Sequence, residues 1–461
     1  MSLSSLLFLT RDALATQQMG INITGANIAN VDTPGYTRQR AQIKSTGMID
    51  VAAGSVQLGI AVSRIERIYD RYVEAQIIDQ RQNSGYSNEL LRGLQNIEVM
   101  LDNTSGGGLT DQMSKFWAAW ENLSNNPAGL VERSDLLASA QNLTATINSH
   151  DKGLNTINAD MNRNITDVVS RINDKAAEIS QLNARIIDAA GDMGNNNALR
   201  DKRLESLKEL ADMVNINWIE DPYGALSVYL SNGDPLVQGA TSRALRIELD
   251  ENIRSRIYST GSPTEPINSS VTKGTLGAYI EVQSSIIPQY IDYINNCALS
   301  LAQGVNELHR SGFDLNQNTG RDFFTIGDMK NAARSIAVSG AIASNTNRIA
   351  VSSTISGDGD NARKIASIQY ELIMNNRTST LNGYLATLVG QIGRQTANAR
   401  TESDRQTAVM NQLNNQRESA SGVSIDEEMI NLIKYQMAYT AAAKLCVTVN
   451  EMLDTLMELL K

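Results

Sequence analysis

Hydrophobic positions near the C-terminus follow a regular helical pattern. Steps of three and four residues alternate along one seam, formed by Leu432, Tyr435, Tyr439, Ala442, Cys446, Val449, Leu453, Leu456 and Leu460. This heptad pattern is typical of a coiled coil, and an amphipathic helix packed on its own domain is the alternative. Ser424 precedes three acidic residues, and a serine cap followed by negative charge predicts that the helix begins there.

A second heptad pattern opens the chain. Leu7, Leu14, Ile21 and Ile28 are spaced by seven, and the pattern ends at the sequence Asp-Thr-Pro-Gly-Tyr, which ends at Tyr36. Proline followed by glycine is typical of a turn. We therefore predict an N-terminal helix whose apolar seam pairs with the C-terminal helix, and a turn that leads the chain away from this pair.

The middle of the chain changes character twice. Ile165, Ile172, Ile179 and Ile186 recur every seven residues, and the amphipathic segment 197–214 follows them, which together predict a helical hairpin. Between residues 215 and 272, short runs of alternating apolar and polar residues are divided by turn sequences, a pattern typical of strands. Helical character returns at residues 276–308 and, less clearly, at 363–420.

These patterns predict a mainly α fold with an inserted β domain (α+β). We expect three parts. Residues 1–45 and 422–461 form a terminal coiled-coil domain as an axial core. Residues 46–214 and 273–421 form an elongated, mainly helical body with the character of a helical bundle. Residues 215–272 form a small β-rich outer domain that we expect to fold as its own unit.

Composition narrows the class of protein. The formal net charge of −10 argues against binding to nucleic acid or to an anionic membrane surface, because both need clustered Lys and Arg. We expect no membrane insertion, since no long apolar run occurs, and no signal peptide is apparent at the start. Cys297 and Cys446 allow one disulfide at most, and two buried thiols are the simpler interpretation.

Candidate chemistry is sparse. The two histidines, His150 and His309, have no nucleophile or carboxylate partner suggested by spacing, so we predict no catalytic residue, no cofactor and no metal. Asp314, Asn316 and Asn318 resemble the first half of a calcium loop. However, the glycine comes one place late and Thr325 replaces the expected Glu, which favours a tight Asx-rich turn.

The sequence Gly25-Ala-Asn-Ile-Ala-Asn-Val-Asp-Thr-Pro-Gly-Tyr-Thr-Arg38 closely resembles the N-terminal motif of the axial proteins of the bacterial flagellum, a family of rod, hook and hook-associated proteins. The C-terminal segment 421–460 is similar to the hook–filament junction members, the hook-associated protein 1 group. Segments 197–214, 274–316 and 387–399 agree with the same members, as does Gly320-Arg-Asp-Phe-Phe324. The larger members carry an outer domain after this last segment, and we expect it to be missing here.

The resemblance implies a structural protein of the extracellular flagellum that joins the hook to the filament and assembles as a ring at the hook tip. It implies export by the flagellar type III apparatus without a cleaved signal peptide. The implied partners are the hook protein, the second hook–filament junction protein (hook-associated protein 3), a cytoplasmic export chaperone that binds the C-terminal region, and copies of the chain itself.

The residues expected to mediate assembly are the two apolar seams named above together with five motif residues, Asn27, Asn30, Pro34, Gly35 and Tyr36. Two alternative functions remain open. Another axial protein, of the hook or distal rod, would share the N-terminal motif. A secreted enzyme carried on axial helices would need a catalytic group, and no motif for one is found.

Overall fold

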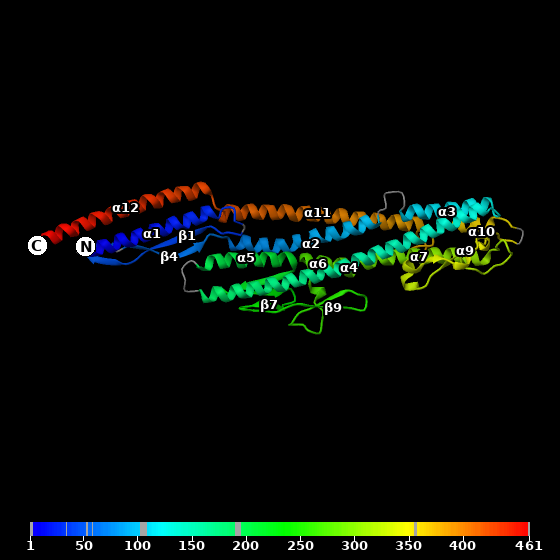
Figure 1. The fold of residues 1–461 in the computed structure, drawn as a ribbon, viewed down its shortest axis with the longest axis horizontal. Coiled ribbons are helices and arrows are strands. Elements are labelled where there is room, and N and C mark those ends of the chain that lie inside the picture. The colour runs from blue at the N-terminus through cyan, green and yellow to red at the C-terminus, as the bar shows by residue number, and fades with distance from the viewer. Residues whose placement is uncertain are drawn as a thin grey trace.

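The chain folds into an elongated molecule with both termini at the same end (Figure 1). The computed structural model describes residues 3–33, 35–51, 54–57, 59–101, 108–189, 195–354 and 357–459. The first and last helices lie side by side at one end, long helices form the middle, and short helices cover the other end. The predicted fold class, mainly α with a small β part, is confirmed.

The terminal end of the molecule combines two helices with a β-hairpin. Helix α1 (Leu3–Ala29) contacts α12 (Ile425–Glu458), and it also contacts strands β1 (Gln39–Ser45) and β4 (Ile60–Arg67). These strands pair antiparallel, and the shorter strands β2 (Met48–Val51) and β3 (Gly54–Gln57) pair beyond them. The sequence pattern predicts residues 46–67 as part of the helical body, whereas most of them form strands, and β4 contacts α1.

The body combines long helices with short ones. Their bounds are α2 (Arg71–Leu101), α3 (Leu109–Asn125), α4 (Leu130–Asp188), α5 (Asn195–Met213), α6 (Gly274–Glu281), α7 (Ile287–Ser311), α8 (Ala332–Ser335), α9 (Gly340–Ser344), α10 (Asp360–Ser367) and α11 (Leu381–Ser421). The short strands β11 (Phe324–Thr325) and β12 (Ala337–Val338) pair antiparallel at the far end.

Helices α6 and α7 are joined by a single π-helical turn, Val282–Ile286. Pro288 stands at the start of α7. A proline has no N–H to donate, and its ring crowds the carbonyl four residues earlier, so a wider turn before it relieves the clash. The two helices therefore continue in one direction along the body.

Aromatic side chains are few, and most of the large ones gather in one core at the far end. Phe116, Trp117 and Trp120 of α3 meet Phe323 and Phe324, and all five are almost fully buried. Ring centroids of Trp120 and Phe323 are 5.2 Å apart, within the range of favourable aromatic contact. This cluster concentrates five of the chain's eight Phe and Trp residues in one place.

The isoleucine heptads form a second core in the middle of the body. Ile165, Ile172, Ile179 and Ile186 of α4 are buried, and α4 packs against α5 as the predicted helical hairpin. Four strands form an antiparallel sheet in the order β5 (Ile216–Glu220), β6 (Leu226–Leu230), β7 (Pro235–Gln238) and β8 (Thr241–Ser242), and β9 (Arg246–Leu249) pairs with β10 (Ser255–Tyr258).

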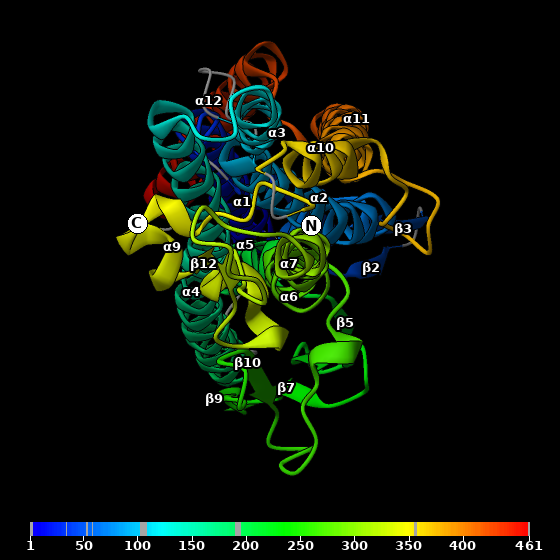
Figure 2. The same cartoon turned by 90° about the vertical axis from the view of Figure 1, so that its right-hand side faces the viewer.

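Strands β5 to β10 lie on one side of the helices, away from α11 and α12 (Figure 2). Val228 and Val237 of this sheet belong to the same buried cluster as Ile172 and Ile179 of α4. The strands therefore share a core with the helices, whereas the sequence pattern predicts an insertion that folds as its own unit. The division of the chain into three domains remains a prediction.

Candidate assembly site

The N-terminal motif ends α1 and folds the chain back onto it. The Asn30 side-chain amide donates to Ala26 O at 2.8 Å, and Gly35 has a φ of +78°, a left-handed conformation that suits glycine. The Tyr36 hydroxyl then donates to Asn27 Oδ1 at 2.8 Å. Pro34 lies outside the described residues. Asn30, Gly35 and Tyr36 thus form the reversal, and Asn27 accepts the hydrogen bond that closes it.

Asn27 connects the motif to the C-terminal helix. Its Nδ2 donates to Glu428 Oε2 at 2.9 Å and to Gln39 O at 2.9 Å, and its Oδ1 accepts from Gln39 N. Arg38 donates through Nε to Glu428 Oε1 at 2.9 Å and through Nη1 to Glu427 Oε2 at 2.8 Å. Asn27 is 1% exposed and Glu428 is 2% exposed, so this is a buried network that joins residues 401 positions apart in sequence.

The Tyr36 hydroxyl is a stable donor in this network. Burial, together with the nearby carboxylates of Asp201 and Glu428, raises the pKa of Tyr36 to about 12. The phenol therefore keeps its proton at neutral pH and continues to donate to Asn27.

The contact face of α1 differs from the predicted seam. Leu7, Leu14, Ile21 and Ile28 are only half-buried, whereas the buried face consists of the small or polar residues Thr10, Thr16, Gly20, Thr24 and Asn27 together with Ile23. A Cβ added at Gly20 would lie 2.7 Å from Tyr435 Cδ1, so the Tyr435 ring rests directly on the α1 backbone. Hydrophobic spacing alone missed this face because its members are mostly not hydrophobic.

The seam of α12 faces α1 with varying burial. Val449 is 1% exposed, and Leu432, Tyr435, Ala442, Cys446 and Leu453 are half-buried. Tyr439 and Leu456 are more exposed, and Leu460 lies outside the described residues. Ser424 caps the helix as predicted, because its side chain accepts from Glu427 N. The role of these residues in assembly stays a prediction.

The outer face of the helix pair exposes large apolar side chains. We call these residues the outer stripe; they are Ile425, Met429, Ile430, Ile433, Met437, Leu445, Val447, Met452 and Met457 of α12, Leu459 directly after it, and Phe8 and Met19 of α1. Met437 is 68% exposed and Ile433 is 47% exposed. Large apolar side chains exposed in this number on one helix are typical of an interaction site in a soluble protein.

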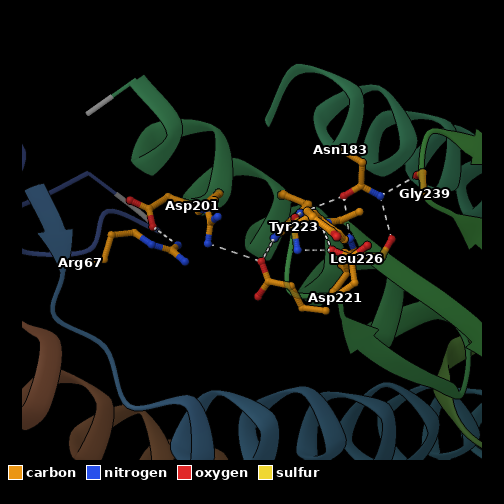
Figure 3. A network of polar contacts seen from close by, with 12 residues as sticks. Arg67, Asn183, Asp201, Asp221, Tyr223, Leu226 and Gly239 are labelled. Carbon is orange, nitrogen blue, oxygen red and sulfur yellow. Dashed lines mark hydrogen bonds and ion pairs between the residues drawn. The ribbon is translucent and has the colours of Figure 1, made fainter. Parts of the chain in front are cut away.

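Polar contacts fasten the terminal end to the body (Figure 3). Arg67, at the end of β4, pairs with Asp201 of α5 at 2.8 Å, and the Thr37 hydroxyl donates to the same carboxylate at 2.8 Å. Two residues further along α5, Arg203 donates to Asn183 of α4 at 2.9 Å and pairs with Glu220 at 2.6 Å.

Asn183 continues this chain of contacts into the sheet, because its amide donates to Leu226 O and Gly239 O, each at 2.7 Å (Figure 3). The hairpin beside α1 is thereby linked through α5 and α4 to the strands. Sequence reasoning did not find these pairs, since an Arg and an Asp far apart in the chain carry no spacing signal.

The residues considered for chemistry have structural roles. His309 is buried: Ala350 N donates to its Nε2 at 2.9 Å, and its Nδ1 lies 2.7 Å from Arg321 O. Asp314 Oδ1 accepts from Asn316 N and Asn318 N, which makes the predicted Asx-rich turn. Within the described ranges, no group of three or more His, Cys, Asp and Glu side chains is arranged to hold a metal ion.

Cys297 is fully buried, and neither it nor Cys446 forms a disulfide. A search of the described helices finds none with the length and apolar character needed to cross a membrane.

Comparison with known proteins gives a consistent family. The family model described as "Flagellar hook-associated protein FlgK helical domain" matches residues 94–324. The ends match two further models: "Flagella basal body rod protein" at residues 10–37 and "Flagellar basal body rod FlgEFG protein C-terminal" at residues 415–459. The models that match the two ends are thus named for basal body rod proteins, and the model that matches the middle is named for FlgK.

Individual relatives agree with this assignment. The chain is 28% identical to flagellar hook-associated protein 1 of Bacillus subtilis (strain 168), over 96% of each chain. It is 26% identical to the protein of the same name from Escherichia coli (strain K12), over 99% of this chain and 100% of the relative. That second alignment runs over 550 positions, more than the 461 residues present here, so the relative has segments that this chain lacks.

A solved structure supports the fold. The flagellar hook junction protein FlgK from Burkholderia pseudomallei aligns with a TM-score of 0.69 and 16% identity, over 75% of this chain and all of that one. Because the FlgK helical-domain model matches half of the chain and the relatives align over nearly its full length, this chain belongs to the flagellar hook-associated protein FlgK family.

Proposed function

We propose that this chain is a structural subunit that joins the hook of the bacterial flagellum to its filament, and that copies of it form a ring at the hook tip. The observation that carries this proposal is the outer stripe. The chain pairs its own terminal helices and still leaves many large apolar side chains of α12 exposed. In a ring, a patch on one subunit meets a different patch on the next, so such a stripe can be covered by a neighbouring copy.

The energetics favour this use of the stripe. Complete burial of a side chain such as Ile433 or Met437 contributes about 1.5–3 kcal/mol, and each is roughly half-exposed or more in the single chain. Burial of several such side chains between copies supplies the driving force for assembly. The body contributes less apolar surface to contacts between copies, because most of its large apolar residues are buried in its own two cores.

For the partners, we propose those that the resemblance to hook-associated proteins implies. The hook protein would contact the ring from below, and hook-associated protein 3 would contact it from above. A cytoplasmic export chaperone would cover the C-terminal helix before secretion, since an amphipathic helix with an exposed apolar face suits a hydrophobic groove. We further propose an extracellular location at the hook–filament junction, reached through the flagellar type III apparatus without a cleaved signal peptide.

Two other functions are less well supported. A hook or distal rod protein would account for the terminal matches but not for the match at residues 94–324. A secreted enzyme would need an accessible catalytic group, and both histidines are buried among structural contacts. We therefore propose a non-enzymatic role.

Electron microscopy of flagella from a deletion strain tests the proposal. We expect hooks without filaments and flagellin released into the medium, and we expect reintroduction of the gene to restore filaments. Cells without hooks would instead identify a rod or hook protein. Normal filaments in the deletion strain would rule out a required junction role.

A further inference from the structure

Two contacts between α1 and α12 occur at the same heptad spacing. Asn27 contacts Glu428, and Gly20 contacts Tyr435. Gly20 lies seven residues before Asn27 on α1, and Tyr435 lies seven residues after Glu428 on α12. The helices are antiparallel, as their termini show (Figure 1). These two contacts therefore define one register for the pair.

The same register explains which residues are buried further along. Continued by heptads, it sets Ala13 opposite Ala442 and Leu6 opposite Val449. Ala13, Ala442 and Leu6 are half-buried, and Val449 is the most buried apolar residue of α12. Small residues at two successive positions of α1, Gly20 and Ala13, allow the helices to approach closely.

Apolar contacts alone do not select this register. Few apolar side chains are buried between the two helices: α12 buries Val449, and the buried face of α1 is mostly Thr, Gly and Asn. Apolar burial therefore contributes little to the choice between this register and one shifted by a heptad. The same shift moves Glu428 away from Asn27 and Arg38. It leaves a carboxylate that is 2% exposed without its amide and guanidinium partners, and an unpaired buried charge is strongly unfavourable.

We propose that the buried polar layer of Asn27, Arg38 and Glu428, with the Gly20–Tyr435 contact one heptad away, determines the register of the terminal helix pair. Two of the three members of this layer, Asn27 and Arg38, belong to the N-terminal segment, which positions them through its own contacts. Tyr36 and Gln39 hold the Asn27 amide, and the turn after Asn30 places Arg38 beside it. Glu428 then completes the layer and fixes the axial position of α12, including the outer stripe that it presents.

Cross-linking of the purified full-length chain tests the register directly. Cys446 is half-buried on the seam, and the proposed register sets it near Thr10, whereas Gln17 lies one heptad away. Thr10→Cys and Gln17→Cys place the new thiol one heptad apart. Thr10 is buried and Gln17 is half-buried, so poorer access of the reagent to residue 10 works against the expected preference. Heptads are about 10 Å apart along a helix, so a thiol cross-linker with a shorter span distinguishes them. Cys297 is fully buried, and the chain without an added cysteine measures any background from it.

We expect Thr10→Cys to be linked to Cys446 about tenfold more than Gln17→Cys, a ratio that one unpaired buried charge sustains. In a chain that also carries Asn27→Leu and Glu428→Leu, the polar layer is gone and the ratio should fall toward one. An unchanged ratio in that chain, or equal linking of the two cysteines in the native background, would overturn the proposal.

A conservative pair of variants keeps the test valid if the leucine chain misfolds. Asn27→Asp sets two carboxylates against each other without a change of shape, so the ratio should again fall. Adding Glu428→Gln restores a donor opposite the new carboxylate and should restore the preference for Thr10→Cys. Absence of this rescue would count against the layer. The cross-linking is measured on the isolated chain. The register proposal can therefore be wrong while the proposed junction function is right, and the junction function can be wrong while the register proposal is right.

Discussion

Five aromatic side chains at the far end of the body are almost fully buried, whereas α12 buries only Glu428 and Val449 of its 34 residues. Both regions are rich in apolar residues. The difference is where their partners lie: α3 meets α4, α10 and the segment that follows α7 within one chain, but most of the apolar surface of α12 meets none. The body therefore buries most of its large apolar residues within one chain, and we propose that other molecules cover the exposed apolar residues of the terminal pair.

Buried charged groups differ in the same way between the two regions. In the body, Arg133 is 1% exposed and donates to three main-chain oxygens, those of Pro127, Thr346 and Ile349. Burial lowers the pKa of Arg133 to about 10. At the terminal end, Glu428 instead pairs with side chains of the N-terminal motif. Arg133 thus holds the segment around Thr346 and Ile349 against α4, whereas Glu428 joins the two ends of the chain.

Deletion of residues 216–270 should produce the largest loss of stability. The strands share a core with α4 and α5, and each side chain uncovered by their removal contributes about 1.5–3 kcal/mol when fully buried. The sum is comparable with the total stability of a typical domain, about 5–15 kcal/mol. We expect the deleted chain, joined by a short linker, to lose helical circular dichroism. An unchanged melting curve would show that the β part folds independently, as the sequence pattern alone predicted.

Trp120→Ala should cost about 3–5 kcal/mol of unfolding free energy, because it leaves a cavity in the aromatic core. Urea unfolding followed by circular dichroism measures the change. Trp120→Phe is the matched control, and it should cost less because the Trp120 Nε1 has no hydrogen-bond partner to lose. Equal losses in the two variants would mean that burial of the ring does not dominate at this position.

Acid should destabilise the body through His309. Burial lowers the pKa of His309 to about 4, so below pH 6.5 the unfolded chain binds a proton that the folded chain does not. Stability is then present above pH 6.5 and falls by about 2 kcal/mol between pH 6.5 and pH 5. Urea unfolding across this range measures the slope.

The same titration in a His309→Gln chain should show a smaller slope. Burial also lowers the pKa of His150, so a His150→Gln chain separates the contribution of the second histidine. An identical slope in the His309→Gln chain would show that its protonation is not linked to folding.

The sequence predicted the body better than the terminal end. Heptads of isoleucine and alternation in short strands predicted α4, α5 and the β part, because these elements bury apolar residues at regular spacing. The seam predicted for α1 is half-buried, since its contact face is made mostly of Thr, Gly and Asn, which hydrophobic periodicity does not register.

The hairpin of β1 and β4 was missed for a related reason. Its residues are mostly half-buried or exposed and many are charged, so the alternation of apolar residues is weak. The pairing of Arg38 with Glu428 could not be predicted at all, because nothing in a single sequence links an arginine to a glutamate 390 positions away.

The smallest effect on the isolated chain, and the sharpest test of the comparison, is expected from Ile433→Asp in the outer stripe. Ile433 is 47% exposed, so the change should alter unfolding free energy by no more than about 0.5–1 kcal/mol. Between copies in a ring the same carboxylate would be buried without a partner, at a cost of several kcal/mol. Glu451→Gln on the same helix is the control, because an exposed charge contributes little.

For both variants, melting of the purified chain, the amount of secreted protein and swimming should be measured together. We expect Ile433→Asp to melt normally and to be secreted, and to leave hooks without filaments, while Glu451→Gln swims normally. If Ile433→Asp cells swim normally, the outer stripe is not an assembly surface. If its melting temperature falls sharply instead, the stripe belongs to the fold of the single chain, and the contrast between α12 and the body is lost.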